Sequence, residues 1–313
     1  KRQVDNILTG WNMSQKTNAK TIVVVGGVAG GASFAARARR LNESANIIIL
    51  ERGAYISFAN CGLPYFIGGE IQSREKLLVQ TPERFARRFH VDVRVRNEAI
   101  SLDRKTKTLE VRDHKNNRTY QQPYDILVLS PGAEPIRPPL PGIENPGIFS
   151  LRTVEDAETI RGYVETNDPH DAVVIGGGFI GLEMLENLTH MGLHVTLVEM
   201  ADQVMAPLDK EMAEWIHQHL QLRGVELLLG HAVEGFSRTT EGRLAVSVTG
   251  GKKIVCDMVV SAIGVTPETK LARQAGLEIG PRKGIVVNEY LQTSDRDIYA
   301  LGDAIETENH VAG

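Results

Sequence analysis

Cysteine is scarce in this 313-residue sequence, which holds only Cys61 and Cys256. Two cysteines exclude a disulfide framework and favour a reducing, cytoplasmic setting. No apolar run approaches the roughly 18 residues of a membrane-spanning helix, so no membrane partner is expected. The first twelve residues lack the apolar core of a secretory signal, and Met13 is a candidate natural start. A net charge of −4 gives no basis for nucleic-acid binding.

The composition is that of a folded protein with many tight turns. Hydrophobic residues make up 42% and charged residues 24%, and there are 30 glycines. These values are typical of soluble globular α/β proteins, and the length is sufficient for two domains with cores of their own.

The strongest organisational signal is an internal repeat. In the first copy, the apolar run 21–25 predicts a buried parallel strand, and a glycine-rich loop, 26–31, follows it. A helical stretch, 33–41, then leads to a second buried strand, 46–50, which ends at Glu51.

The second copy has the same order of elements. A strand at 172–175 leads into the loop 176–181, and a helix then runs to His190. The next strand, 194–198, ends at Glu199. From first glycine to acid is 25 residues in the first copy and 23 in the second.

The two copies also end alike. In 125–135 and again in 257–267, a glycine follows an aspartate by seven residues and a proline follows it by ten. The proline-rich stretch 135–142 can continue neither sheet and is interpreted as a linker. Residues 284–288 and 293–303 look like a return to the first copy. We therefore predict an α/β fold of two doubly wound, Rossmann-like dinucleotide-binding domains, the second inserted in the first.

The glycine loops are suited to phosphate. A helix N-terminus offers unpaired N–H groups and partial positive charge, and an acid about 20 residues further on can hold ribose hydroxyls. The second loop is complete, whereas Val28 replaces the middle glycine of the first. Met200, Ala201 and Asp202 follow Glu199, so no arginine is there to receive a 2′-phosphate. We therefore expect NADH rather than NADPH.

Cys61 lies shortly after the first acid, followed by Gly62, Leu63 and Pro64. A proline is tolerated in the first turn of a helix, and a helix N-terminus stabilises a thiolate. The alternative is a buried structural cysteine. Cys256 lies inside the apolar run 254–260, which we interpret as one core strand.

The segment from Ser57 to Gly69, SFANCGLPYFIGG, resembles the redox motif of single-cysteine flavoprotein disulfide reductases and is most similar to coenzyme A-disulfide reductases. The wider family includes NADH oxidases, NADH peroxidases and per- or polysulfide reductases. The similarity runs from about Lys20 to the end of the chain. It implies an FAD-binding domain at 20–132 and 263–313, with an NAD(P)H-binding domain at 133–262 between these parts.

The resemblance also implies roles for individual residues. The FAD site would comprise Gly26, Ala29, Gly30, Gly31, Glu51, Arg52, Ala99, Ser130, Pro131, Gly132 and Asp303. The NADH site would comprise Gly176, Gly178, Phe179, Ile180, Glu183, Glu199 and Gly264. Cys61 would be the redox centre, flanked by Ser57 and Asn60. Coenzyme A would contact Ser33, Arg37, Arg40, Ser57 and Asn60, with Arg84, Arg87 and Arg88 as a second basic cluster. No metal site is expected.

The implied reaction passes hydride from NADH to FAD and electrons onward to Cys61, whose thiolate attacks a disulfide, persulfide or polysulfide. One coenzyme A is expected to stay on Cys61 between turnovers. Ala29 stands where oxidases and peroxidases carry a histidine, which favours disulfide reduction. NADH oxidase or peroxidase activity is the alternative. A second alternative is a catalytically incompetent nucleotide-binding fragment. The chain ends ten residues after Asp303, so we expect a truncated form lacking the C-terminal dimerisation domain of a homodimeric enzyme.

Overall fold

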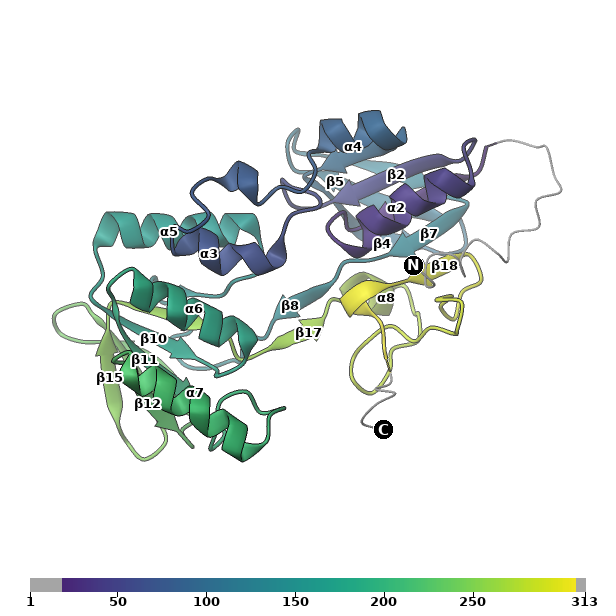
Figure 1. Cartoon of the computed structure of the whole chain (residues 1–313). Helices are drawn as coiled ribbons and strands as arrows, with labels where there is room; N and C mark the ends of the chain where they lie inside the picture. The colour runs from purple at the N-terminus through teal and green to yellow at the C-terminus, as the bar shows by residue number, and fades with distance from the viewer. Residues whose placement is uncertain (1–18, 308–313) are drawn as a thin grey trace. The chain divides into compact units, whose positions relative to one another are not determined.

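The computed structural model describes residues 19–307, which form two compact units. Unit 1 consists of residues 19–58, 78–134 and 266–307, and unit 2 consists of residues 59–77 and 135–265. In Figure 1 the yellow strand β18 (Ile298–Ala300) and the purple elements α2 (Gly30–Leu41) and β2 (Asn46–Glu51) belong to unit 1, whereas the green elements, such as α6 (Phe179–His190) and α7 (Lys210–Leu222), belong to unit 2. The second repeat is thus inserted in the first, but residues 59–77, predicted as part of the first domain, belong to unit 2. The prediction of residues 1–12 as a non-signal segment and of Met13 as a start lies outside the described residues.

Unit 1 is built on a five-stranded sheet of order β18-β7-β1-β2-β3, in which every neighbouring pair is parallel. Its strands are β1 (Thr21–Val25), β2 (Asn46–Glu51), β3 (Asp92–Val95), β7 (Ile126–Leu129) and β18 (Ile298–Ala300). The central strands are almost wholly apolar because both faces of the sheet are covered. β18, from the end of the chain, pairs with β7, so the C-terminal segment returns to the first module as predicted.

A second, antiparallel sheet and three helices complete unit 1. The sheet has the order β4-β5-β6, and the ranges are β4 (Asn97–Asp103), β5 (Thr108–Asp113) and β6 (Arg118–Pro123). The helices are α2 (Gly30–Leu41), α4 (Pro82–Phe89) and α8 (Lys270–Gln274), with a short turn η3 (Gly302–Ala304). α2 packs on β1 and β2 and buries Phe34 completely, which stabilises the unit by roughly 2–3 kcal/mol.

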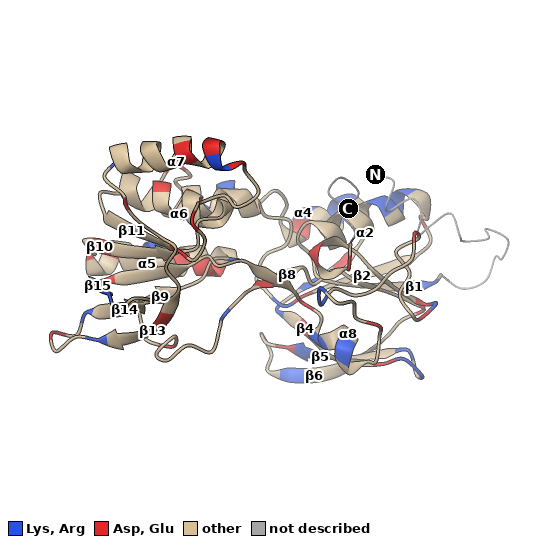
Figure 2. Ribbon diagram, turned by 90° about the horizontal axis from the view of Figure 1, so that it is seen from below, with Lys and Arg blue, Asp and Glu red and all other residues tan. Residues whose placement is uncertain are grey.

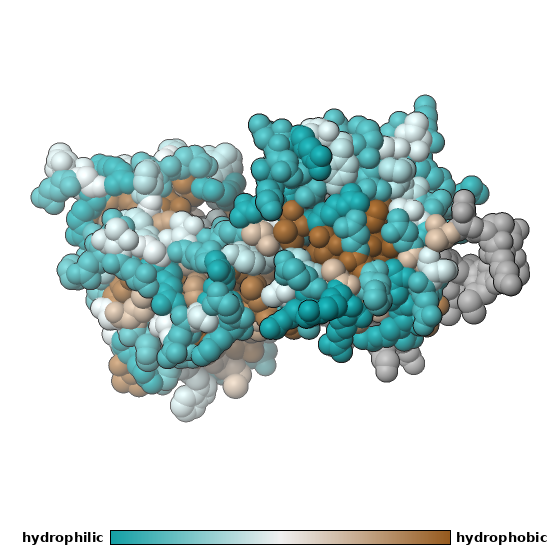
Figure 3. Space-filling view, turned by 90° about the horizontal axis from the view of Figure 1, so that it is seen from above, coloured by the Kyte–Doolittle hydropathy of each residue, from teal (hydrophilic) through white to brown (hydrophobic). Residues whose placement is uncertain are grey.

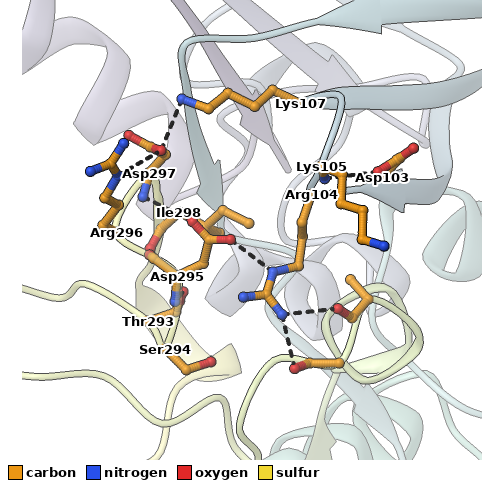
Figure 4. Close-up of polar contacts among 12 residues, drawn as sticks. Asp103, Arg104, Lys105, Lys107, Thr293, Ser294, Asp295, Arg296, Asp297 and Ile298 are labelled. Carbon is orange, nitrogen blue, oxygen red and sulfur yellow. Dashed lines mark hydrogen bonds and ion pairs between the residues drawn. The ribbon is translucent and has the colours of Figure 1, made fainter.

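The turn after β4 anchors the C-terminal segment of unit 1. Arg104 donates to the Asp295 carboxylate at 2.8 Å and to the backbone carbonyls of Ala275 and Gly276 (Figure 4). Lys107 pairs with Asp297, also at 2.8 Å. These contacts fix residues 293–297, which precede β18, against the antiparallel sheet.

Unit 2 repeats this architecture. Its parallel sheet has the order β12-β11-β10-β16-β9. The strands are β9 (Ile148–Phe149), β10 (Asp171–Ile175), β11 (His194–Glu199), β12 (Glu226–Leu229) and β16 (Met258–Ser261). The antiparallel sheet contains β13 (Val233–Arg238), β14 (Leu244–Val248) and β15 (Lys253–Cys256). The helices are α3 (Leu63–Ile67), α5 (Val154–Asn167), α6 (Phe179–His190) and α7 (Lys210–Leu222), with short turns η1 (Asn60–Gly62) and η2 (Arg74–Lys76). Two short strands, β8 (Ala133–Pro135) and β17 (Val265–Pro267), lie where the chain crosses between the units.

The apolar run 254–260 is not one strand. It is divided between β15 of the antiparallel sheet and β16 of the parallel sheet, because the polar Asp257 interrupts it and is bonded to Arg243 and to the backbone of Asp171. Cys256 is nevertheless completely buried, as predicted.

From the composition, the described residues are expected to form a globular protein without a membrane-spanning segment. No helix among them combines the length and apolar character needed to cross a membrane. In the face shown in Figure 3, hydrophilic residues cover most of the visible surface, and distinct hydrophobic areas lie among them. No group of three or more side chains that could hold a metal ion occurs in this part of the chain.

Candidate functional site

The first glycine loop connects β1 to α2 in unit 1. Gly26 has φ +96°, and a β-carbon built on it would lie 2.1 Å from the carbonyl oxygen of Ser130 at the end of β7. The acid at the end of β2 is tied to this loop, because Glu51 Oε2 accepts from the Gly27 N–H at 2.8 Å and Oε1 from the Gly53 N–H at 2.7 Å. Loop and acid are thus held together at the carboxyl ends of parallel strands, where nucleotides bind in such sheets.

The second glycine loop, between β10 and α6, has the same geometry. Gly176 has φ +102°, and a β-carbon there would lie 2.4 Å from the carbonyl oxygen of Ala262. Glu199 Oε2 accepts from the Gly177 N–H at 2.6 Å, and Oε1 accepts from the Ala201 N–H at 2.7 Å. The repeat in the sequence is therefore a repeat of hydrogen bonds as well.

Both loops fit a dinucleotide pyrophosphate. No side chain caps α2 or α6, whose N-cap residues are Ala29 and Gly178. A β-carbon on Gly178 would meet no protein atom within 4 Å, so protein packing does not explain the glycine there. The space and the uncapped N–H groups suit a phosphate approaching the backbone. Val28, half-buried, takes the equivalent position in unit 1.

The end of β7 and the end of β18 meet at the first loop. A β-carbon on Gly30 would contact both the Ser130 hydroxyl and the Leu301 side chain. Gly302, with φ +75°, follows Leu301, and the exposed Asp303 lies in the next turn, η3. Sequence-predicted residues from three distant segments of the FAD site are thus brought together within unit 1.

Arg52, predicted to contact FAD, takes part in a charge cluster of unit 1. Its guanidinium pairs with Glu134 at 2.8 Å and with Glu268 at 3.3 Å. Burial raises the pKa of the Glu268 carboxyl, and its hydrogen bond with Glu134 raises it further. Glu268 also donates its backbone N–H to the carbonyl of Gly132, one of the predicted flavin-lining residues.

The remaining predicted cofactor residues occupy defined positions. Gly132 and Gly264 both have positive φ, at +78° and +116°. Pro131 lies between β7 and β8, and Ala99 is half-buried in β4 opposite Val111. Phe179 is 68% exposed, which rules out a core role for its ring, and Ile180 beside it is also exposed.

Cys61 is exposed in the turn η1, and α3 begins two residues later with Pro64 in its first turn. The predicted helix start after the cysteine is therefore confirmed. Asn60 is exposed in the same turn. Ser57 belongs to unit 1, where its backbone adopts φ +47° and its N–H donates to the Gly27 carbonyl.

Two residues that the sequence did not single out fix α3 within unit 2. Arg161 of α5 stacks on the Phe66 ring at 4.9 Å and donates to the Phe66 carbonyl. Asn187 of α6 fills the space beside Gly68, where any side chain would collide with it. Asn187 is a polar residue on the otherwise apolar buried face of α6, and its burial became evident only in the structure.

The surroundings of α3 are acidic. Partial burial, followed by the charges of Glu183 and Glu186, raises the pKa of Tyr65. Burial and Glu186 also raise the pKa of the Glu183 carboxyl. α6 thus carries the glycine loop at its start and this acid one turn further on.

The two predicted arginine clusters of unit 1 are brought together around Phe89. The Arg40 guanidinium of α2 lies 5.8 Å from the ring centroid and that of Arg88 of α4 lies 5.3 Å away. Arg39 donates to the carbonyls of Phe89 and His90 and so joins the helices. Figure 2 shows basic residues along α2. Ser33 and Arg40 are exposed on α2 and Arg37 is half-buried, while Arg84 and Arg87 are exposed on α4.

Fold and site define a protein with two dinucleotide-binding units and one exposed cysteine. The family model for pyridine nucleotide-disulphide oxidoreductases matches residues 20–312, and the chain belongs to this family. The family and its relatives imply FAD and NAD(H) as cofactors. A Methanocaldococcus jannaschii NADH oxidase is 35% identical over 292 residues, which are 93% of this chain and 64% of the relative. A Staphylococcus aureus coenzyme A disulfide reductase is 35% identical over 282 residues, 90% of this chain and 63% of the relative.

Solved structures agree with these relatives. The reduced CoADR-RHD of Bacillus anthracis matches with a TM-score of 0.91 and 52% identity, over 95% of this chain and 53% of that one. An NAD-dependent persulfide reductase from A. fulgidus matches with a TM-score of 0.87 and 39% identity, over 92% and 54%. The two-domain α/β fold is thereby confirmed. The chain spans less than two thirds of each of these proteins.

Proposed function

We propose that this chain carries the FAD- and NADH-binding parts of a disulfide oxidoreductase that reduces coenzyme A disulfide, or a coenzyme A persulfide or polysulfide, through Cys61. The exposure of the Cys61 thiol at the start of α3, in the unit that also holds the second glycine loop, carries this proposal. The similarity to a coenzyme A disulfide reductase and to a persulfide reductase supports the substrate class.

In this proposal each unit holds one nucleotide. The first loop, Glu51 and the exit formed by Ser130 to Gly132 would hold FAD, with Ala29, Arg52, Ala99 and Asp303 completing the site. Gly176, Gly178 and Glu199 would hold NADH, with Phe179, Ile180, Glu183 and Gly264 around the nicotinamide end. FAD supplies the two-electron link between a nicotinamide and a thiol.

The protein's own part in the reaction is nucleophilic. The Cys61 thiolate attacks one sulfur of the substrate disulfide, a Cys61–sulfur bond forms, the substrate S–S bond breaks, and one thiolate leaves and takes up a proton. Two electrons, supplied by NADH, and one proton then cleave the mixed disulfide, releasing the second thiol and restoring the Cys61 thiolate. Ser57 and Asn60 would orient the substrate sulfur. One NADH and one proton are used for each disulfide converted to two thiols.

The arginines around Phe89 suit the phosphates of coenzyme A, because guanidinium groups bind phosphate oxygens with charge-assisted hydrogen bonds. Ser33, Arg37 and Arg40 would contact the nucleotide end of the substrate, with Arg84, Arg87 and Arg88 in support. The proposal also includes a homodimeric enzyme in the cytoplasm, as the resemblance and the low cysteine content suggest.

A second candidate, reduction of oxygen or peroxide, is favoured by the 35% identity to an NADH oxidase. Steady-state NADH oxidation by the full-length protein, with coenzyme A disulfide, polysulfide or oxygen as sole acceptor, decides between them. We expect coenzyme A disulfide or polysulfide to support turnover at least tenfold faster than oxygen. Equal or faster turnover with oxygen alone would overturn the proposal. If NADH reduces the bound flavin but no acceptor supports turnover, the chain is a nucleotide-binding fragment.

A further inference from the structure

His217 is a buried histidine of α7 with both ring nitrogens engaged. The residue is 7% exposed. Its Nε2 accepts a hydrogen bond from the backbone N–H of Val204 at 3.1 Å, and its Nδ1 lies 3.1 Å from the Glu214 carboxylate. Because a backbone N–H can only donate, Nε2 must be the unprotonated nitrogen, and Nδ1–H donates to Glu214. Glu214 therefore selects the tautomer that Val204 requires.

Val204 forms one wall of the second glycine loop. Its side chain is completely buried, and a β-carbon on Gly177 would lie 2.9 Å from Val204 Cγ1. The next residue, Met205, donates its N–H to the Gly177 carbonyl at 2.8 Å. Gly177 in turn donates its own N–H to Glu199. A continuous set of contacts thus runs from His217 through Val204 and Gly177 to the acid.

The same wall exists in unit 1, where Ile56 and Ser57 take the places of Val204 and Met205. A β-carbon on Gly27 would lie 2.8 Å from Ile56 Cγ2, and Ser57 donates to the Gly27 carbonyl. Ser57 and Met205 even share a left-handed backbone, with φ of +47° and +50°. The same side-chain and backbone contacts with the second glycine of the loop occur in both modules. We therefore interpret them as part of how each glycine loop is held in place.

We propose that His217 is a positioning residue for NADH. It holds Val204 and Met205 against Gly177, and so keeps the N–H groups of the second loop and the Glu199 carboxylate in the arrangement that receives the nucleotide. This inference rests on the proposed function, because it assigns NADH to the second loop. In this assignment His217 acts through its contact with Val204 and not by contact with the nucleotide.

Glu214 and Asp202 are two carboxylates near His217, and they lie on different segments. Glu214 precedes it by one turn on α7, which shows acidic residues near its start in Figure 2. On the facing segment, Asp202 pairs with Lys210 at 2.8 Å. Because this pair is exposed and its two members are bonded to each other, Glu214 is the direct carboxylate partner of the ring, at Nδ1.

Substitutions at His217 test the hydrogen bond that Nε2 accepts from the Val204 N–H. His217→Gln can place a side-chain oxygen where Nε2 lies, whereas His217→Asn is one methylene shorter and cannot reach Val204. His217→Leu removes the acceptor altogether. His219→Leu makes the same change at an exposed histidine of the same helix and is the matched control. Hydrogen exchange of the Val204 amide reports the bond without any cofactor. We expect exchange at least tenfold faster in the Leu and Asn variants, and within about threefold of the wild-type rate in the Gln variant and the control.

NADH affinity of the FAD-loaded protein gives the second readout. We expect the dissociation constant to rise about tenfold in the Leu and Asn variants, with flavin content unchanged, and the Gln variant to restore it. If the Leu variant does not fold, the Asn variant decides. Accelerated exchange or a lower melting temperature with unchanged NADH affinity would overturn the inference, because His217 would then be merely structural. Wild-type protein that fails to bind NADH would instead overturn the proposed function.

Discussion

Gly181 lies so close to Gly176 that a β-carbon built on it would sit 1.9 Å from the Gly176 carbonyl oxygen. Gly31 and Gly26 have the same relationship in the first module, also at 1.9 Å. The last glycine of each loop is therefore required by the packing of helix against strand. Gly178 differs, since no protein atom lies within 4 Å of a β-carbon placed there. Gly181 is therefore explained by protein packing, whereas Gly178 is explained by the ligand that we propose for this loop.

Gly178→Ala is expected to weaken NADH binding without loss of the fold. Its backbone, with φ −83° and ψ −173°, accepts any residue, so the added methyl group occupies only the open space that we assign to the pyrophosphate. We expect the NADH dissociation constant to rise at least tenfold, about 1.4 kcal/mol or more. Equilibrium binding to the FAD-loaded protein measures this.

Gly162→Ala is the control for that change. Gly162 lies in α5 and also has open space around it, but it belongs to neither loop. It should leave NADH affinity unchanged and stabilise the helix by about 0.5–1 kcal/mol. If both alanine variants bind NADH as the wild type does, the second loop is not the pyrophosphate site.

The two cysteines should differ sharply toward thiol reagents. Cys61 is exposed, whereas burial raises the pKa of the Cys256 thiol to about 12. Because the thiolate is the reactive form, a neutral alkylating reagent at about pH 7.5 should label one thiol per native chain, at position 61, and a second only after unfolding. Mass spectrometry of the labelled peptides checks this. Labelling of Cys256 at a comparable rate in the native protein would contradict the burial described here.

Arg104 should stabilise unit 1 more than a single surface ion pair would. Its bond to Asp295 and its contacts with two backbone carbonyls are lost together in Arg104→Ala (Figure 4), at a cost of about 1–3 kcal/mol. Arg296, exposed and 3.5 Å from Asp297, is the control, and Arg296→Ala should change the free energy of unfolding by less than about 0.5 kcal/mol. Urea titration measures both.

The Arg104 effect should also depend on pH. Burial alone would raise the pKa of Asp295, but the hydrogen bond and charge of Arg104 lower it below the ordinary value. A carboxyl with a lowered pKa stabilises the fold above its unfolded-state pKa, and that contribution is lost as the pH falls through the folded-state value. The difference between wild type and Arg104→Ala should therefore narrow in acid. If the difference in free energy of unfolding between wild type and Arg104→Ala does not change with pH, Arg104 stabilises unit 1 through contacts other than that with Asp295.

The pH dependence expected for Glu268 is opposite to that for Asp295, because the pKa of Asp295 is lowered and that of Glu268 is raised. Burial and the hydrogen bond with Glu134 raise its pKa, so folding disfavours its ionised form and the penalty is largest above the folded-state pKa. Glu268→Gln should raise the melting temperature by about 1–3 °C at pH 7, and the gain should shrink as the pH falls. Glu144→Gln, at an exposed carboxyl paired with Arg137, should show no such trend. A lower melting temperature for Glu268→Gln at pH 7 would mean that the ion pair with Arg52 stabilises the fold more than burial and the neighbouring Glu134 carboxylate destabilise the ionised Glu268.

Much of the fold could be predicted from the sequence because the repeat carries it. Buried strands such as Ile47 to Leu50 are continuous apolar runs, and a glycine loop between such a strand and a helix is typical of a dinucleotide-binding unit. The division of 254–260 into two strands was missed, since periodicity does not distinguish one apolar run from two neighbouring ones. Asp257 was the only break in it.

The candidate site was less accessible to sequence reasoning. The motif around Cys61 located the thiol, but not the contacts of Arg161 and Asn187 that fix α3, because these depend on the packing of helices that are far apart in the sequence. The same holds for His217, whose partner Val204 lies 13 residues away. The meeting of the two arginine clusters at Phe89 could not be predicted either, because α2 and α4 are not consecutive elements of the chain.

The most direct test of the account is whether Cys61 takes up half of a coenzyme A disulfide. Incubation of the reduced, FAD-loaded full-length protein with one equivalent of coenzyme A disulfide, without NADH, should leave one coenzyme A on Cys61 and release one free thiol per chain. Peptide mass spectrometry locates the adduct, which Cys61→Ser should lack while retaining its flavin. No adduct on Cys61, or an adduct that persists in the Cys61→Ser variant, would contradict the assignment of this thiol as the redox centre.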